Sequence, residues 1–125
     1  MSKSRYSKGQ EGENAAADFL TGRGMEIVER NFRCPPGEID IIARDDRAIV
    51  FVEVRTRQAK GFGTPEESIT HVKRARLIRA AQWYLKQHKL FNSSARFDVV
   101  TIRWNGDNFE NPEIKWIVNA FETYS

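Results

Sequence analysis

Two runs of β-branched and aromatic residues, separated by a short polar turn, constrain the fold more than any other feature of the chain. The runs cover residues 37–42 and 48–57. Such segments are typical of strands, and a polar turn between them predicts a β-hairpin. The two residues Asp46 and Arg47 are the simplest loop for this hairpin, although a three-residue loop or a bulge would shift the pairing by one residue.

The register of this hairpin decides how its charged side chains lie. With a two-residue loop Asp40 faces Glu53, at a typical Cβ separation of about 4.5–5.5 Å, where like charges destabilise a sheet unless a cation lies between them. Alternation along the second strand adds Arg55 and Arg57 to the face of Glu53 and sends the valines to the other face. The alternative is a solvent-facing sheet surface whose charges Arg55 balances.

Length and cysteine content limit the class of protein. The 125 residues suit one domain, and a hydrophobic fraction of 40% suffices for a core. Cys34 is the only cysteine, which excludes an intramolecular disulfide and a Cys/His zinc site, and His71 and His88 are expected at the surface. No apolar run reaches the roughly 18 residues of a membrane span, and the N-terminus lacks the apolar core of a signal peptide. We therefore expect a cytoplasmic protein that neither spans a membrane nor is exported.

The distribution of charge says more than the net charge of +3. Basic residues gather in positions 1–8, 55–60 and 73–79, whereas acidic residues gather around the hairpin and in the C-terminal third. An acidic site ringed by basic segments suits a polyanionic partner whose chemistry uses a metal ion.

The N-terminal part of the chain predicts a tail, a helix and a strand. Residues 1–8 are polar and basic and are expected to be a flexible tail before a single domain over residues 9–125. Helical apolar spacing from Gln10 to Thr21 places Glu13 on the packed face, where it could also serve only to favour the helix dipole. Residues 25–33 alternate like a strand, and a Pro-containing turn joins them to the hairpin.

A loop and a long helix are expected after the hairpin. Residues 58–63 form a basic, Gly-containing loop that is either a mobile flap or a plain connector. Thr64 and Pro65 are a good helix start, although Thr70 could cap a later one, and the helix continues to about His88. We expect Arg74 and Arg79 to point away from the core, and the buried residues to be Ile69, Val72, Leu77, Ala80, Ala81, Tyr84 and Leu85.

Two further strands complete the predicted order αβββαββ. They cover residues 95–104 and about 114–119, with a Gly-containing turn between them. Asp98 in the first of these strands either reaches the site or pairs with a nearby arginine. The order describes an α/β fold with a mixed β-sheet flanked by helices. The tryptophans are expected in the core or an interface rather than stacked on bases; they are Trp83, Trp104 and Trp116.

The acidic residues carry a resemblance to a known superfamily. Glu13 on a helix, Asp40 on a strand and the triplet Glu53-Val54-Arg55 match in order and spacing the catalytic core of the restriction-endonuclease-like superfamily. Over residues 8–121 the chain further resembles the YraN family of small bacterial proteins, which look like archaeal Holliday-junction resolvases. The segments that carry this resemblance are Gly12-Glu13, Arg30-Asn31, Gly37-Glu38-Ile39-Asp40, Phe51-Val52-Glu53-Val54-Arg55, Arg76-Leu77 with Ala80-Ala81 and Tyr84-Leu85, and Arg96-Phe97-Asp98-Val99-Val100.

The resemblance implies a restriction-endonuclease-like fold and a metal-dependent endonuclease that hydrolyses phosphodiester bonds of branched or structured DNA. It gives catalytic roles to Glu13, Asp40, Glu53 and Arg55. Asp40, Glu53 and the Val54 carbonyl would hold Mg²⁺, or Mn²⁺ in its place.

The resemblance departs from the usual pattern at one position. Arg55 stands where lysine is expected, and arginine stays protonated and cannot act as a compact ammonium. Lys60 or Lys73 could supply an ammonium from another backbone position.

The nuclease hypothesis also makes expectations about DNA contacts and assembly. The basic residues expected to bind DNA are Arg57, Lys60, Lys73, Arg74 and Arg79. A junction needs paired incisions, which implies a homodimer. The alternative function is a catalytically weak or inactive nucleic-acid-binding module on a nuclease fold. The three acids favour the nuclease, and Arg55 favours the binding module.

Overall fold

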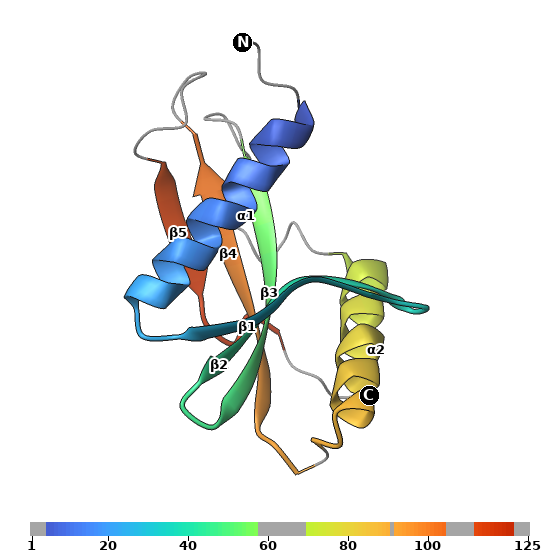
Figure 1. Ribbon diagram of the computed structural model, residues 1–125. Helices are drawn as coiled ribbons and strands as arrows, with labels where there is room; N and C mark the ends of the chain where they lie inside the picture. Colours follow the sequence, from blue (N-terminus) through green and yellow to red (C-terminus); the bar gives the residue numbers. More distant parts are fainter. Residues whose placement is uncertain (1–4, 58–69, 91, 105–111, 122–125) are drawn as a thin grey trace.

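The computed structural model describes residues 5–57, 70–90, 92–104 and 112–121 (Figure 1). The elements in this part are α1 (Arg5–Gly22), β1 (Glu26–Cys34), β2 (Gly37–Asp45), β3 (Ala48–Arg57), α2 (His71–Gln87), β4 (Ala95–Arg103) and β5 (Glu113–Ile117). The strands form one sheet in the order β1-β2-β3-β4-β5. The β3–β4 pair is parallel and the other pairs are antiparallel. The predicted αβββαββ order with a mixed sheet is confirmed and is consistent with a restriction-endonuclease-like fold.

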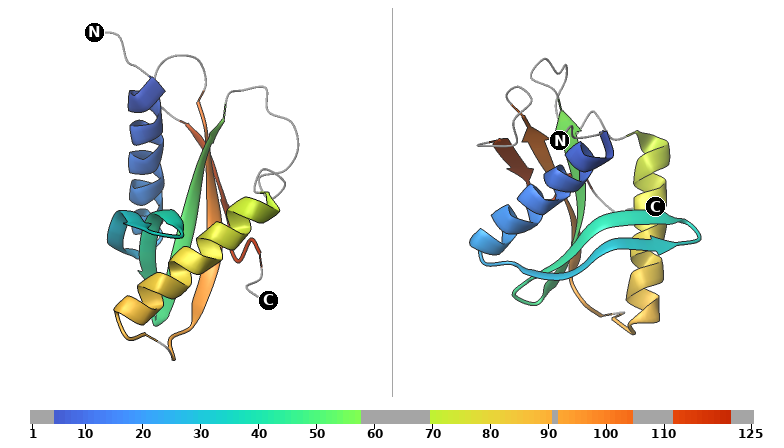
Figure 2. Two further views of the ribbon diagram at one scale, coloured as in Figure 1. Left: turned by 90° about the vertical axis from the view of Figure 1, so that its right-hand side faces the viewer. Right: turned by 45° about the horizontal axis from the view of Figure 1, so that its top comes forward.

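The two helices cover opposite faces of the sheet (Figure 1, Figure 2). Helix α1 buries Ala16, Ala17 and Leu20 in a core formed with residues such as Val52 and Val100. On the other face, α2 buries a second stripe at helical spacing against Phe51 and Phe97; this stripe is Leu77, Ala80, Ala81 and Tyr84. Helix α2 belongs to the crossover connection that parallel strands β3 and β4 require.

The central hairpin has the predicted register. Ile41 pairs with Val52 and Asp45 with Ala48, which leaves a two-residue loop. Asp46 in this loop has a φ of 57°, a left-handed conformation that Asp tolerates better than most residues. The valines of β3 all belong to the α1 side of the sheet, as alternation predicts; they are Val50, Val52 and Val54. The face of Glu53 is therefore the face that α2 covers, and not an open sheet surface.

The hairpin of β1 and β2 changes face partway along its length. Ile41 packs on the α1 side, whereas Ile39, two residues earlier, packs on the α2 side, although strict alternation would put both on one face. On β1, Asn31 has a φ of 55°, which bends the strand at the matching place. The outer half of the hairpin therefore arches toward α2 (Figure 2). Its end at Gly37 lies against Arg76 of that helix.

Helix α1 approaches β3 closely at one point. A Cβ atom built on Gly12 would overlap Oγ1 of Thr56. Only a glycine fits here without movement of the strand residue. The close approach brings the middle of the helix, and with it Glu13, toward the central strand of the sheet.

Both helices begin at residues other than those that the sequence pattern favours. Helix α1 begins at Arg5 rather than Gln10, so it includes part of the basic segment that we expected to be flexible. A helix held by packed residues extends into a neighbouring segment that lacks proline, because each added residue gains a backbone hydrogen bond. Helix α2 is capped by Thr70, the alternative start, and the segment with Thr64 lies outside the described residues.

The exposure of the side chains in α2 and of the tryptophans agrees only partly with expectation. Val72 was expected to be buried but is 62% exposed, because the helix begins only one residue before it and the apolar stripe starts later. Trp104 is buried and Trp116 is partly buried, whereas Trp83 is 45% exposed.

His71 and His88 lie at the surface as expected. Neither described helix is long and apolar enough to cross a membrane.

Candidate active site

Asp40 lies where β2 separates from β3. The backbone ladder between the two strands ends at Ile41 and Val52. At the next position the Asp40 side chain binds the neighbouring strand, because its Oδ2 accepts a hydrogen bond from the Val54 backbone N–H at 2.9 Å. Since a buried N–H without an acceptor is costly, this bond fixes the carboxyl group beside the strand that carries Glu53.

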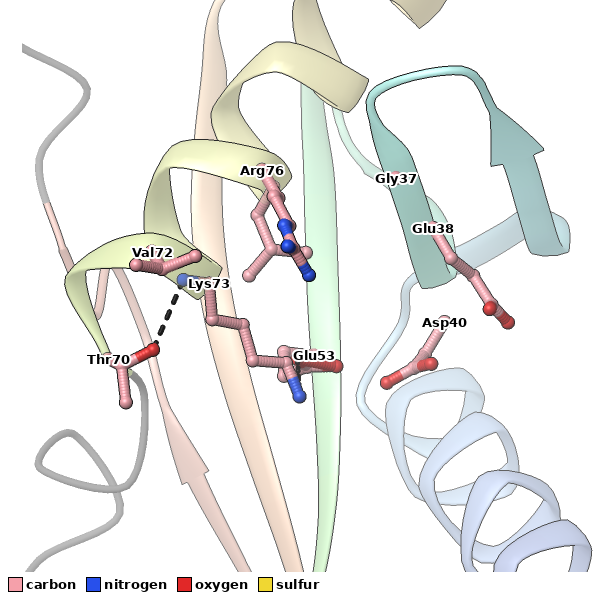
Figure 3. Close-up of a pocket in the computed structure, with 9 residues that line it drawn as sticks. Gly37, Glu38, Asp40, Glu53, Thr70, Val72, Lys73 and Arg76 are labelled. Atoms are coloured by element: carbon pink, nitrogen blue, oxygen red, sulfur yellow. Dashed lines mark hydrogen bonds and ion pairs between the residues drawn. The ribbon is translucent and has the colours of Figure 1, made fainter.

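Glu53 lies beneath α2 and is only 6% exposed (Figure 3). Its proximity changes the protonation of Asp40. The pKa of Asp40 is raised from 3.8 to about 8, first because burial disfavours the carboxylate and then because of a hydrogen bond to Glu53 and the charge of Glu53. The structure thus brings together the two acids that the hairpin register predicts as neighbours.

Lys73 brings a cation to this acid pair from the first turn of α2. Its Nζ atom lies 3.0 Å from Oε2 of Glu53. The contact is an ion pair without hydrogen-bond geometry, because Oε2 accepts no hydrogen bond from the described residues. The Lys73 side chain is 42% exposed, so its ammonium reaches both the buried acid and solvent.

Glu13 approaches Asp40 from the α1 side. Its side chain is 21% exposed, and Oε1 lies 3.8 Å from Nη2 of Arg30. The pKa of Glu13 is raised, first by burial and then by the charge of Asp40, while Arg30 and a hydrogen bond with Asn31 act in the opposite direction. Because β2 changes face beside it, Asp40 interacts with Glu53 on one side of the sheet and with Glu13 on the other.

An open pocket of about 470 Å³ lies over Asp40 and Glu53, between α2 and the end of the β1–β2 hairpin. Lys73 and Arg76 extend into it from the helix, toward the side where the acids lie (Figure 3). The lining residues are Gly37, Glu38, Asp40, Glu53, Thr70, Val72, Lys73, Arg76 and Leu77. The pocket therefore combines an acidic floor with a basic wall.

Arg76 and Thr70 are among the lining residues that were not expected at the site. Arg76 follows Lys73 by three residues, and this spacing on a helix places both side chains on one face. Thr70 caps the helix and accepts a hydrogen bond from the Lys73 backbone N–H at 3.2 Å. The helical spacing could have identified Arg76 from the sequence once Lys73 was considered.

The other expected site residues that the structure describes do not line this pocket. Arg55 is half-buried and, by alternation along β3, belongs to the face of Glu53. The Val54 side chain packs on the α1 side. Arg79 is exposed on α2. The guanidinium of Arg74 lies 5.5 Å from the centre of the Phe121 ring. Lys60 and the side chain of Arg57 lie outside the described part.

Asp98 forms a separate cluster rather than part of this pocket. The side chain is fully buried and accepts hydrogen bonds from Arg96, from Nε1 of Trp116 and from the Asn119 backbone N–H. The expectation that it pairs with a nearby arginine is confirmed. The cluster links β4 to β5 and has a structural role.

The acid pair fits Mg²⁺ as an ion held only partly by protein. Within the described residues, no three His, Cys, Asp or Glu side chains gather closely enough to hold a metal by themselves. Mg²⁺ is, however, commonly held by one or two carboxylates and completes its shell with waters and substrate phosphates. The raised pKa of Asp40, and the lack of a hydrogen bond from any described residue to Oε2 of Glu53, indicate two acids that a divalent cation would stabilise.

Comparisons with known proteins give the family. Residues 12–102 match the family described as "Uncharacterised protein family UPF0102". A UPF0102 protein of Moorella thermoacetica is 52% identical over 102 residues, 82% of this chain and 85% of the relative. The relative from Syntrophotalea carbinolica is 44% identical over 110 residues, with 88% and 89% covered. That from Geobacter metallireducens is 43% identical over 122 residues, 98% of both chains. The chain therefore belongs to the UPF0102 family, the YraN family that its motifs resemble.

Proposed function

We propose that the protein is a metal-dependent endonuclease that hydrolyses phosphodiester bonds of branched or structured DNA, with Mg²⁺ as its cofactor and Mn²⁺ as a substitute. One observation carries this proposal. Asp40 and Glu53 lie together on the floor of an open pocket whose helical wall carries Lys73 and Arg76. Two acids suit a divalent cation, and the two cations suit the phosphate of the substrate.

The energetics of the acid pair support a metal site rather than a structural pair. Burial and the neighbouring Glu53 raise the pKa of Asp40 to about 8, so the protein does not favour two negative charges here. A fold that needed only packing at this position would be served better by apolar residues, since removal of charges from water is costly. A divalent cation held by the two acids would favour the charged form of Asp40 at neutral pH.

The residues would divide the work of hydrolysis as follows. Asp40, Glu53 and the Val54 carbonyl would hold the metal ion, with Glu13 as a nearby carboxylate. The ion supplies a Lewis acid for the phosphoryl oxygen and lowers the pKa of a coordinated water. The reaction joins a water oxygen to phosphorus and breaks one P–O ester bond; the attacking water loses a proton to solvent, and the leaving alkoxide gains one. Arg55 would stabilise negative charge on the phosphate.

The substrate and assembly form part of the same proposal. The preference for branched DNA rests on the resemblance to junction resolvases, and a homodimer would supply the paired incisions that a junction requires. Exposed Arg79 on α2, with Arg57 and Lys60, would add phosphate contacts beyond the pocket, whereas the guanidinium of Arg74 lies over the Phe121 ring. A DNA substrate agrees with a location in the cytoplasm.

Cleavage of a labelled four-way junction, with duplex and single-strand controls, tests the proposal in Mg²⁺ and in Mn²⁺. We expect Asp40→Asn and Glu53→Gln to lower the single-turnover rate by at least about 100-fold, because each removes a charge that would hold the metal. Asp18→Asn, which changes an exposed acid of α1 in the same way, should cut like the wild type. Cutting by both acid variants at the wild-type rate would reject this site.

A second function has a specific observation in its favour. Lys73 already balances Glu53 at 3.0 Å, and Arg55 replaces the usual lysine, so a catalytically weak or inactive nucleic-acid-binding module would also tolerate this arrangement. In that case the wild type should bind junction DNA without cutting it in either metal. The acid variants should then bind at least as tightly, because they remove negative charge near the phosphates.

A further inference from the structure

Lys73 is built into the pocket rather than lying on a solvated helix face. Its backbone N–H donates to Oγ1 of Thr70 at 3.2 Å, which fixes the first turn of α2 above the acids. From there the side chain reaches down to Glu53 (Figure 3). The position of the ammonium is thus set by the helix cap and by the length of the lysine side chain.

The contact with Glu53 leaves most of the ammonium's bonding capacity available. Lysine has three N–H donors, whereas the 3.0 Å contact with Oε2 lacks hydrogen-bond geometry. Glu53 is 6% exposed and Lys73 is 42% exposed, so the ammonium stands between the buried acid and the open pocket. An anion in the pocket can therefore contact this cation without reaching the buried Glu53.

Neighbouring charges favour a phosphate as that anion. Arg76 extends from the same helix face into the pocket and adds a second cation beside Lys73. Asp40 and Glu53 on the floor would repel an anion that arrived alone, but a phosphodiester can face the cations on one side and a divalent ion on the other. Lys73 is better placed than Arg76 for the reacting phosphate because it already contacts Glu53 of the acid pair.

We propose that Lys73 has two partners in turn: Glu53 in the free protein, and a non-bridging oxygen of the scissile phosphate when DNA is bound. This inference rests on the proposed function, which supplies the phosphate and the divalent ion. The ammonium remains protonated throughout and acts by hydrogen bonding and charge. It supplies, from helix α2, a compact cation that Arg55 on β3 cannot provide.

The test compares wild type with Lys73→Met and Lys73→Gln, two neutral replacements of different polarity. Lys86→Met is the matched control, because Lys86 is an exposed lysine in the last turn of the same helix. Binding of a four-way junction is measured in Ca²⁺ over a range of salt concentrations, and single-turnover cleavage is measured in Mg²⁺. Lys73→Arg shows whether a charge without the ammonium's compact shape suffices.

We expect both neutral variants to weaken junction binding and to reduce the slope of log K against log salt by about one, as for one lost phosphate contact. Cleavage should fall by at least about 100-fold, with partial recovery in Lys73→Arg, and Lys86→Met should match the wild type in both measurements.

The two measurements separate this inference from the proposed function. If wild type cuts the junction and the Lys73 variants keep its salt slope and rate, the role of Lys73 is rejected and the nuclease stands. If the slope falls by about one but wild type cuts in neither Mg²⁺ nor Mn²⁺, the phosphate contact stands and the nuclease is rejected.

Discussion

At the scale of single residues, the site depends on Asp40. This carboxyl group replaces a backbone contact between β2 and β3, by accepting the Val54 N–H, and it also adjoins Glu53. One side chain thus ends the strand ladder and completes the acid pair that a divalent cation would stabilise. The consequence is a link between metal binding, protonation and the stability of the central sheet.

The raised pKa of Asp40 determines how the free energy of unfolding changes with pH. The folded protein holds the Asp40 proton up to about pH 8, whereas the unfolded chain releases it near 3.8. Between these values the folded state binds more protons, so the free energy of unfolding falls as pH rises, by at most about 1.4 kcal/mol per pH unit, and levels off above about pH 8. Urea unfolding in EDTA from pH 5 to 9 measures this slope.

Variants at two acids show whether Asp40 causes the slope. Asp40→Asn retains an acceptor for the Val54 N–H but cannot ionise, so its free energy of unfolding should fall less steeply across this range. Asp18→Asn, at an exposed site on α1, should keep the wild-type slope. Equal slopes for wild type and Asp40→Asn would assign the pH dependence to other groups.

The sequence predicts the acid pair but not its cation. A two-residue turn fixes the register of the hairpin, and the register alone makes Asp40 and Glu53 neighbours. The contact of Lys73 with Glu53 depends instead on where α2 packs after its crossover. Local pattern leaves Lys60 and Lys73 as equal candidates, because neither strand alternation nor helical spacing places either lysine beside Glu53.

At the scale of elements, the change of face in the β1–β2 hairpin shapes the pocket. Ile39 and Ile41 are both apolar, so their sequence pattern gives no sign that they enter different cores. The bend at Asn31 depends on a single positive φ, which Asn permits but does not require. The pocket wall formed by the hairpin end could therefore not be predicted, although both strands could.

The close approach of α1 to β3 gives a prediction for Gly12. Alanine favours a helix over glycine by about 1 kcal/mol, yet the added Cβ would overlap Oγ1 of Thr56. We expect Gly12→Ala to lower the free energy of unfolding by about 1–3 kcal/mol, measured by urea denaturation. Gly22→Ala, where a Cβ meets nothing within 4 Å, should change it by no more than about 0.5 kcal/mol.

A double variant isolates the cause of this loss. Thr56→Ala removes the overlapping oxygen, so Gly12→Ala should no longer destabilise the protein when it is made in that background. If Gly12→Ala costs the same with and without the Thr56 hydroxyl, the loss does not come from this contact, and glycine serves another purpose in the helix.

At the scale of the whole molecule, the two helices bring chemistry from both faces of the sheet to one place. Glu13 comes from α1, Lys73 and Arg76 come from α2, and Asp40 lies between them because β2 changes face there. The order of elements could be predicted from the sequence, since each has a local pattern. Their convergence could not, because it depends on which face each helix covers.

The arrangement of cations over the molecule predicts which of them meet DNA. Arg79 is exposed on α2 and follows Arg76 by one turn, so it extends the basic wall of the pocket along the helix. Arg74 belongs to the same helix, but its guanidinium lies over the Phe121 ring, where it contributes to packing. Lys115 on β5 lies at the other edge of the sheet from β1 and is exposed.

Salt-dependent binding of a four-way junction in Ca²⁺ distinguishes these positions. Arg79→Gln should weaken binding and reduce the salt slope by about one, because one phosphate contact is lost. Arg74→Gln should mainly lower the melting temperature, and Lys115→Gln should change neither quantity. A reduced slope for Lys115→Gln, with no change for Arg79→Gln, would indicate that DNA binds at the β5 edge of the sheet and not along α2. That result would also separate DNA binding from the acid pair, since the pocket opens between α2 and the β1–β2 hairpin.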